Sequence, residues 1–271
     1  MTDDIKQAVR ERYAGYASAG TSCCGSSSAC GCGSEGASLA LGYDPAELAD
    51  IPAGADLGLG CGNPIVLADL QPGETVLDLG SGAGIDCFLA AKRVGPTGHV
   101  IGVDMTPEMI VRARANAAAA GLGTVEFRLG EIENLPVETG MVNAVISNCV
   151  INLVPDKSRA FAESFRVLAP GGRFVVSDVV LQGEIPEGLR ASITGYVACL
   201  SGAVLEWEYL AGLRDAGFVA IEILERVPYV TTADDPFVRE IALSAGVASA
   251  DAADVASRFS SVRVRAIKPG A

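Results

Sequence analysis

The stretch VLDLGSGAGIDC at residues 76–87 decides which fold we expect. Its first residues are mostly apolar, as in a buried strand, and its last residues open a helical pattern. Between them lie Gly80, Gly82 and Gly84, with the spacing G-x-G-x-G. Glycines at such a place let a ligand approach the backbone closely at a helix N-terminus. The stretch therefore predicts a strand, a ligand-binding turn and a helix.

Strand and helix patterns alternate through the rest of the chain. We expect strands at residues 75–80, 99–104, 125–130, 142–148, 173–180, 219–225 and 261–268. We expect helices at residues 85–94, 107–120 and 157–168, followed by a helix stop and turn in LAPGGRF (168–174). Regular alternation with short turns is typical of a mostly parallel sheet with helices on both faces. The expected fold class is α/β, with a Rossmann-like, doubly wound sheet of seven strands.

The sequence divides into three parts by composition. Residues 1–70 hold an amphipathic helix at 3–18, then a flexible arm rich in Gly, Ser and Cys, and a loop-rich bridge. Residues 71–180 hold the alternating pattern around the glycine turn. Residues 181–271 hold substrate-side helices, the last strands and an Ala-rich helical insert at 236–258. We expect the middle part to bind the cofactor.

Charge and hydropathy exclude several classes of partner. The net charge of −13 argues against nucleic acid, because binding to phosphates requires cations from the protein. No apolar run reaches the ~18 residues that a membrane span needs, and the N-terminus is charged from residue 3 onward, unlike a secretory signal. We expect a cytoplasmic protein whose partner is a small molecule.

Eight cysteines and a single histidine restrict the chemistry. The cytosol keeps thiols reduced, so reactive or metal-binding thiols are a better interpretation than disulfides. His99 precedes a strand pattern and is expected to be a strand-entry residue. Cys87 follows the glycine turn on the first helix, where we expect it to pack against the sheet outside any site.

Acidic residues near three strand ends indicate the kind of cofactor. Asp78 precedes the first glycine and would repel a pyrophosphate but attract a cationic amino-acid group. Asp104 ends the second strand and can accept both hydroxyls of a ribose, as in NAD and S-adenosylmethionine sites. In GEIENLP (130–136), Ile132 offers an apolar wall and Glu133 a polar partner for adenine. These residues favour S-adenosylmethionine over NAD, with a Rossmann dehydrogenase or a lapsed cofactor site as the alternatives.

Several longer segments resemble the bacterial arsenite methyltransferases, which are class I S-adenosylmethionine-dependent methyltransferases. The segments are SCCG (22–25), DLGLGCGNP (56–64), DLGSGAGIDCFLAA (78–91), GVDMTPEMI (102–110), SNCVINLVPDK (147–157) and VACLSGA (197–203). The most specific of them is SNCVINLVPDK, and it lacks the N/D-P-P-Y motif that methyltransferases acting on amino groups of nucleic acids and proteins typically carry.

The resemblance implies a cofactor, a substrate and the residues that bind them. The cofactor is S-adenosylmethionine, and the residues expected to contact it are Asp78, Gly80, Gly82, Gly84, Asp104, Met105, Glu131, Ile132, Glu133 and Asn148. The substrate is trivalent arsenic, and the resemblance implies thiol ligands at Cys61, Cys149 and Cys199. A further thiol is expected from the arm, from Cys23 or Cys24 or, with the choice left open, from Cys30 or Cys32.

Trivalent arsenic would explain why thiols, rather than a general base, gather near a methyl donor. It has a lone pair and needs no deprotonation, and a thiol bound to a soft centre is itself deprotonated. The leading hypothesis is an arsenite methyltransferase that acts in arsenic detoxification. It would receive arsenite as a thiol conjugate and use a thiol reductant such as glutathione or thioredoxin. The alternatives are a small-molecule C- or O-methyltransferase and a non-catalytic, thiol-based metalloid-binding protein.

Overall fold

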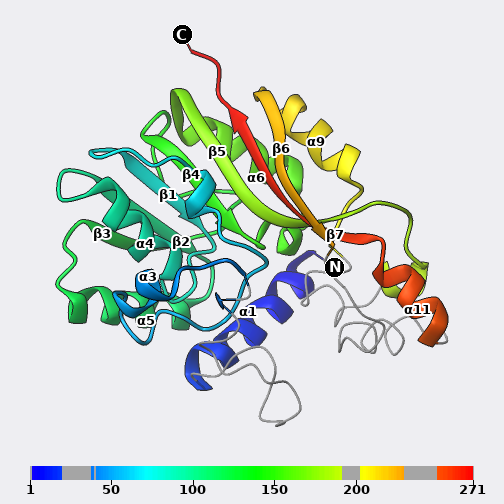
Figure 1. Cartoon of the computed structure of the whole chain (residues 1–271), viewed down its shortest axis with the longest axis horizontal. Helices are drawn as coiled ribbons and strands as arrows, with labels where there is room; N and C mark the ends of the chain where they lie inside the picture. The colour runs from blue at the N-terminus through cyan, green and yellow to red at the C-terminus, as the bar shows by residue number, and fades with distance from the viewer. Residues whose placement is uncertain (1, 20–37, 40, 191–201, 229–248, 271) are drawn as a thin grey trace.

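A computed structural model describes residues 2–19, 38–39, 41–190, 202–228 and 249–270 (Figure 1). It contains one twisted sheet whose strand order is β3-β2-β1-β4-β5-β7-β6. The strands are β1 (Thr75–Leu79), β2 (His99–Asp104), β3 (Val125–Leu129), β4 (Val142–Asn148), β5 (Leu168–Leu181), β6 (Val219–Pro228) and β7 (Phe259–Ile267). Strands β1 to β5 pair in parallel, and β7 is antiparallel to both β5 and β6. The predicted doubly wound, mostly parallel sheet of seven strands is confirmed.

Helices and short turns connect these strands. The α-helices described are α1 (Thr2–Ala19), α3 (Pro45–Ala49), α4 (Ile85–Val94), α5 (Pro107–Ala120), α6 (Lys157–Val167), α7 (Glu187–Arg190), α9 (Glu206–Asp215) and α11 (Ser249–Ala256). Local sequence sets their ends. Pro107 begins α5 and Gly121 ends it in a left-handed conformation, while the Asp156 side chain caps α6 by accepting from the Arg159 N–H.

Two apolar layers cover the two faces of the sheet. Alternate residues of each strand point to opposite faces, so Leu77 packs in one layer and Val76 in the other. The layer with Leu77 includes Phe161 of α6, and the layer with Val76 includes Phe88 of α4. This burial fixes the sheet rigidly, so the strand ends are defined positions for functional side chains.

The segment LAPGGRF (168–174) differs from the prediction. Helix α6 does end at Val167, but Leu168 is already extended and pairs with Val142, so the segment belongs to β5. The backbone N–H of Gly171 donates to the carbonyl of Lys268 at 3.0 Å. The predicted separate turn is a bulge inside β5: the register against β4 jumps from Leu168 opposite Val142 to Arg173 opposite Ala144, and Gly171 has a φ of 77°.

The predicted helices near the two ends of the chain can be compared with the structure in part. Helix α1 occupies the predicted lead helix, and α11 lies in the predicted insert, whose residues 236–248 are outside the described part. The three-part division of the chain stays a prediction. Among the described helices, none combines the length and the apolar character that crossing a bilayer would require.

Candidate active site

The glycine turn lies between β1 and α4, at the carboxyl edge of the sheet. The backbone N–H groups of Gly80 and Ser81 donate to the Val103 carbonyl of β2, at 2.8 and 3.0 Å. The Asp104 carboxylate accepts from the N–H of Gly82 at 2.9 Å and from that of Thr106 at 2.8 Å. Asp104 therefore joins the end of β2 to the turn, and burial raises the pKa of its carboxyl although the backbone N–H groups of Gly82, Met105 and Thr106 donate to it.

The three glycines of the turn have different roles. A Cβ on Gly84 would lie 2.7 Å from the Phe88 ring, and a Cβ on Gly80 would overlap Val150, so both glycines allow close packing. A Cβ on Gly82 would meet no atom within 4 Å, and its φ is 51°. The buried Ser81 hydroxyl has no hydrogen-bond partner among the described residues. The open space at Gly82 and this hydroxyl fit a bound ligand at the turn.

Two buried carboxylates lie below the turn. Asp78 is 2% exposed and accepts a hydrogen bond from the Cys87 thiol at 3.2 Å. Asp86 accepts from the Tyr43 hydroxyl at 2.8 Å. Burial raises the pKa of Asp78 well above its ordinary value and the pKa of Asp86 to about 6. The charge of Asp86 contributes to the raised pKa of Asp78, so a positively charged ligand group beside the pair would favour the ionised forms of both.

Helix α1 engages the acidic residues that follow β3. Lys6 Nζ lies 2.7 Å from a Glu131 carboxylate oxygen and 3.0 Å from a Glu133 oxygen, and Arg10 also pairs with Glu131. The hydrogen bond from Lys6 lowers the pKa of Glu131. Ile132 between them is buried. Both predicted cofactor-contacting glutamates are thus paired with α1, and their contact with a cofactor stays a prediction.

Asn148, at the end of β4, fixes the loop that carries Cys61. Its Oδ1 accepts from the Cys61 backbone N–H at 3.0 Å, and its Nδ2 donates to the Gly62 carbonyl at 2.8 Å. The same Nδ2 lies 2.9 Å from the Tyr43 hydroxyl and 3.3 Å from Asp86 Oδ2. Sequence reasoning expected a cofactor contact at Asn148, whereas its observed partners position the Cys61 loop.

The glycines on both sides of Cys61 explain the sequence GCG. Gly60 has a φ of 149°, and a Cβ there would lie 2.8 Å from Asn148 Nδ2. A Cβ on Gly62 would overlap the Ser177 hydroxyl and lie 3.1 Å from Ser177 Cβ. The loop can approach the ends of β4 and β5 this closely only because these side chains are absent.

Cys149 lies where β4 turns into the next segment. Its φ of 60° is in the left-handed region, which is uncommon for residues other than glycine. Its backbone N–H donates to the Ser177 carbonyl at 2.7 Å, and the Cys61 thiol donates to the same carbonyl at 3.4 Å. Both cysteines are 7% exposed. The carbonyl of Ser177 therefore anchors both cysteines.

Cys61, Cys149 and Asp178 converge in one buried cluster, which we call the thiol cluster. Their sulfur and carboxylate oxygen atoms all lie within 4.8 Å of one another. Asp178 accepts from the Val179 N–H at 2.9 Å and from the Tyr209 hydroxyl at 3.3 Å. Burial raises the pKa of Asp178 to about 7. Sequence reasoning missed Asp178, although an acidic residue inside the apolar run FVVSDVVL (174–181) was a signal.

Other predicted thiol ligands lie outside the described residues. These are Cys199 and the arm cysteines Cys23, Cys24, Cys30 and Cys32. Met105, predicted to contact the cofactor, packs against the apolar cluster that includes Cys61 and Cys149. The glycine turn and the thiol cluster are therefore connected through the end of β2.

Comparison with known proteins identifies the family. Residues 70–223 match a family described as a methyltransferase domain. The solved structure of an arsenic (III) S-adenosylmethionine methyltransferase from Chlamydomonas reinhardtii is 36% identical, with a TM-score of 0.65. The similarity covers 86% of this chain and 73% of that one. The chain belongs to the arsenite methyltransferase family.

Curated arsenite methyltransferases match most of the chain but are longer. The protein of Halobacterium salinarum is 53% identical over 230 residues, which cover 82% of this chain and 59% of that protein. The protein of Aquipseudomonas alcaligenes is 41% identical over 64% of this chain and 51% of its own length. The chain thus spans little more than half the length of these relatives. S-adenosylmethionine is the cofactor of the arsenite methyltransferase family, and the glycine turn fits it.

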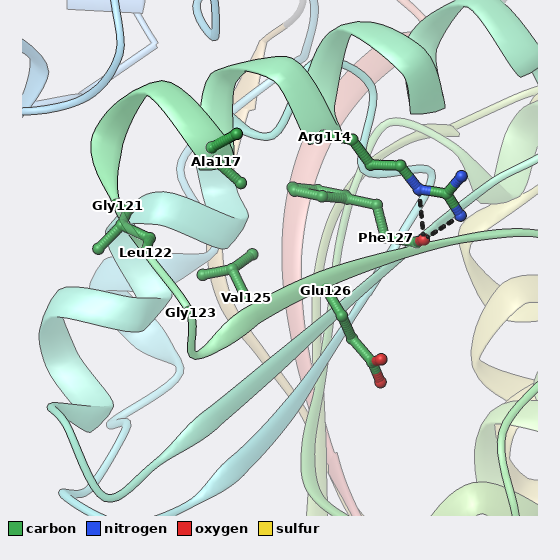
Figure 2. A pocket seen from close by; sticks show the side chains of 9 residues that line it. Arg114, Ala117, Gly121, Leu122, Gly123, Val125, Glu126 and Phe127 are labelled. Carbon is green, nitrogen blue, oxygen red and sulfur yellow. Dashed lines mark hydrogen bonds between the residues drawn. The ribbon is translucent and has the colours of Figure 1, made fainter.

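A separate pocket lies at the opposite end of β3, between that strand and α5 (Figure 2). Arg114 lines it and donates twice to the Phe127 carbonyl, at 3.1 and 2.7 Å. None of the predicted site residues that the structure describes lines this pocket. Ligands of doubly wound folds bind at the carboxyl ends of the strands, so the glycine turn, and not this pocket, is the expected place of the cofactor.

Proposed function

We propose that the protein transfers a methyl group from S-adenosylmethionine to thiol-bound trivalent arsenic. The observation that carries this proposal is the convergence of Cys61 and Cys149, whose neighbour Val150 packs against Gly80 of the glycine turn. A metal–sulfur bond is about 2.3 Å long, so two sulfurs that share one atom lie at most about 4.6 Å apart. The two sulfur atoms lie within 4.8 Å, so a small movement lets both bind the same arsenic atom.

The residues of the cluster suit trivalent arsenic, which binds thiols and keeps a lone pair. Cys61 and Cys149 supply sulfur ligands from a loop and from the end of β4, and burial keeps water from competing for arsenic. S-adenosylmethionine, when bound, supplies a methyl carbon on a sulfonium that the arsenic lone pair can attack. The chain's own task is to hold arsenic in line with that carbon, and such positioning supplies much of the rate.

Three further features belong to the proposal. Cys199 is the third thiol ligand, and one of the arm cysteines binds arsenite early. Methyl transfer oxidises arsenic formally, so a thiol reductant such as glutathione or thioredoxin restores the trivalent state. The high thiol content fits the reducing cytosol, which is the proposed location.

The decisive experiment measures arsenic species by mass spectrometry after incubation with arsenite, S-adenosylmethionine and a thiol. We expect methylated arsenicals from the wild type and a large loss in Cys61→Ser, Cys149→Ser and Cys199→Ser. Binding of S-adenosylmethionine is the control, and each variant is expected to retain it.

The same assay separates the alternatives. A C- or O-methyltransferase would leave arsenite unmethylated and be indifferent to these substitutions. A binding protein without turnover would bind arsenite but form no S-adenosylhomocysteine. Near-wild-type methylation by Cys149→Ser would refute the assignment of that thiol.

A further inference from the structure

We propose that Cys61, Cys149 and Asp178 also form a site for a thiophilic divalent cation such as Zn²⁺ or Cd²⁺. The competition that this site implies, between the cation and arsenite for the same two thiols, rests on the proposed function. Binding of the cation does not.

The donor atoms and their spacing carry the proposal. Two sulfur atoms and one carboxylate oxygen come from three different parts of the chain and lie within 4.8 Å of one another. Zn²⁺ binds sulfur at about 2.3 Å and carboxylate oxygen at about 2.0–2.2 Å, usually with four ligands. Three protein ligands with one open position are the pattern of sites that can exchange a bound water or substrate. The thiol cluster offers that number and mixture of donors.

Surrounding groups hold the donors in place. The Val179 N–H and the Tyr209 hydroxyl both donate to Asp178. Ser177 anchors both cysteines through its backbone carbonyl, as described above. Hydrogen bonds of this kind orient metal ligands and are worth about 10–100-fold in metal affinity. The cluster is therefore organised before a cation arrives.

Charge gives a reason for a cation to bind. Asp178 is 1% exposed, and two thiolates beside it would add two further negative charges. With both thiols protonated and the carboxylate ionised, the cluster carries −1; a divalent cation that displaces two thiol protons to solvent leaves the total at −1, so the two thiolates form without adding buried charge. The positive charge of Lys157 favours the ionised form of Asp178, which is the form that binds a cation. A bound cation thus compensates charges that would otherwise be costly to bury.

Asp178 distinguishes the two ligands of the cluster. The arsenic site proposed above consists of thiols alone, with Cys199 as the third ligand. The cation site uses the hard oxygen of Asp178 in place of that thiol. Asp178→Asn should therefore weaken the cation, and Cys199→Ser should weaken arsenite.

The experiment titrates the full-length protein with Cd²⁺ and reads the sulfur-to-cadmium charge-transfer absorbance. The background is a variant in which all four arm cysteines are serine, so that Cys23, Cys24, Cys30 and Cys32 do not bind cadmium. We expect one Cd²⁺ per chain, at least about tenfold weaker binding in Asp178→Asn, and unchanged binding in Cys199→Ser. Arsenite titration of the same variants should give the reverse ranking.

Two further variants keep the proposal falsifiable if Asp178→Asn fails to fold. Cys149→Ser should lose the charge-transfer signal, and Tyr209→Phe, which removes one hydrogen bond to Asp178, should weaken Cd²⁺ severalfold. In the arm-cysteine background, equal Cd²⁺ affinity with and without Asp178→Asn would overturn the proposal, as would equal affinity with and without Tyr209→Phe if only that variant folds. Cadmium binding without arsenite binding in the arm-cysteine background and the intact wild type would instead refute the proposed function alone.

Discussion

Replacing Gly62 with alanine tests whether close approach of the loop positions Cys61. The new Cβ would overlap the Ser177 hydroxyl and lie 3.1 Å from Ser177 Cβ and 3.3 Å from Arg263 Nε. Ser177 is fully buried, so its hydroxyl can give way only by displacing neighbours, among them the Cys61 thiol 3.8 Å away. Overpacking of this kind costs about 1–3 kcal/mol.

The overlap should affect both the stability of the fold and the affinity for arsenite. We expect Gly62→Ala to lower the free energy of unfolding in urea by about 1–3 kcal/mol, or to displace the loop and leave the fold intact. In both cases the overlap pushes the Cys61 loop away from Ser177, and we expect Cys61 to move away from Cys149. The affinity for arsenite should then fall by about tenfold or more, which corresponds to about 1.4 kcal/mol. Arsenite titration and urea unfolding of the same preparation measure both quantities.

A rescue and a control define the outcome. Ser177→Ala removes the overlapping hydroxyl but keeps the backbone carbonyl that anchors both cysteines, so the double variant should recover part of the loss. Gly15→Ala in α1 is the matched control, because a Cβ there would meet no atom within 4 Å. Wild-type arsenite affinity in Gly62→Ala, or no recovery in the double variant, would show that this contact does not position Cys61.

Three other predictions concern the cofactor side. Asp104→Ala should weaken S-adenosylmethionine in calorimetric titration, because each charge-assisted hydrogen bond lost is worth about 1.5–3 kcal/mol; unchanged affinity would refute the role of Asp104. Burial raises the pKa of Asp86 from 3.8 to about 6, so the folded state binds the proton more tightly than the unfolded one. The Asp86 carboxyl should therefore contribute a fall in stability of about 3 kcal/mol as pH rises from 4 to 6, and urea unfolding of Asp86→Asn should lack that part of the decline. Lys6→Ala should raise amide hydrogen exchange in α1, because Lys6 pairs with both Glu131 and Glu133; equal exchange would show that the pairs do not hold the helix.

Much of the fold could be predicted because its local signals agree. The stretch around Gly80 combines an apolar strand, a glycine turn and a helix start, and all three are observed there. In LAPGGRF the proline and glycines predict a turn, and the structure has a bulge there instead, which the pairing of Leu168 with Val142 and hydrogen bonds with Lys268 hold within β5. That pairing joins residues far apart in the sequence, so no local pattern contains it.

Single residues of the candidate site could be predicted from the sequence, but the contacts between them could not. Cys61 and Cys149 stand out because one lies between glycines and the other ends a strand. Asp178 passed unnoticed because an isolated carboxylate in an apolar strand has meaning only once its neighbours are known. Cys87 packs against the sheet as expected. The hydrogen bond that its thiol donates to Asp78 could not be predicted, because it depends on how α4 lies over β1.

The amide of Asn148 has consequences for how this protein could change its methyl acceptor. One side chain fastens the Cys61 loop and also reaches the carboxylate of Asp86. The loop itself lies outside the sheet, so an exchanged loop could bring a different ligand for the methyl acceptor while the glycine turn stays in place. Any such graft must preserve the Cys61 N–H and the Gly62 carbonyl that Asn148 binds, because this one side chain attaches the loop to the end of β4.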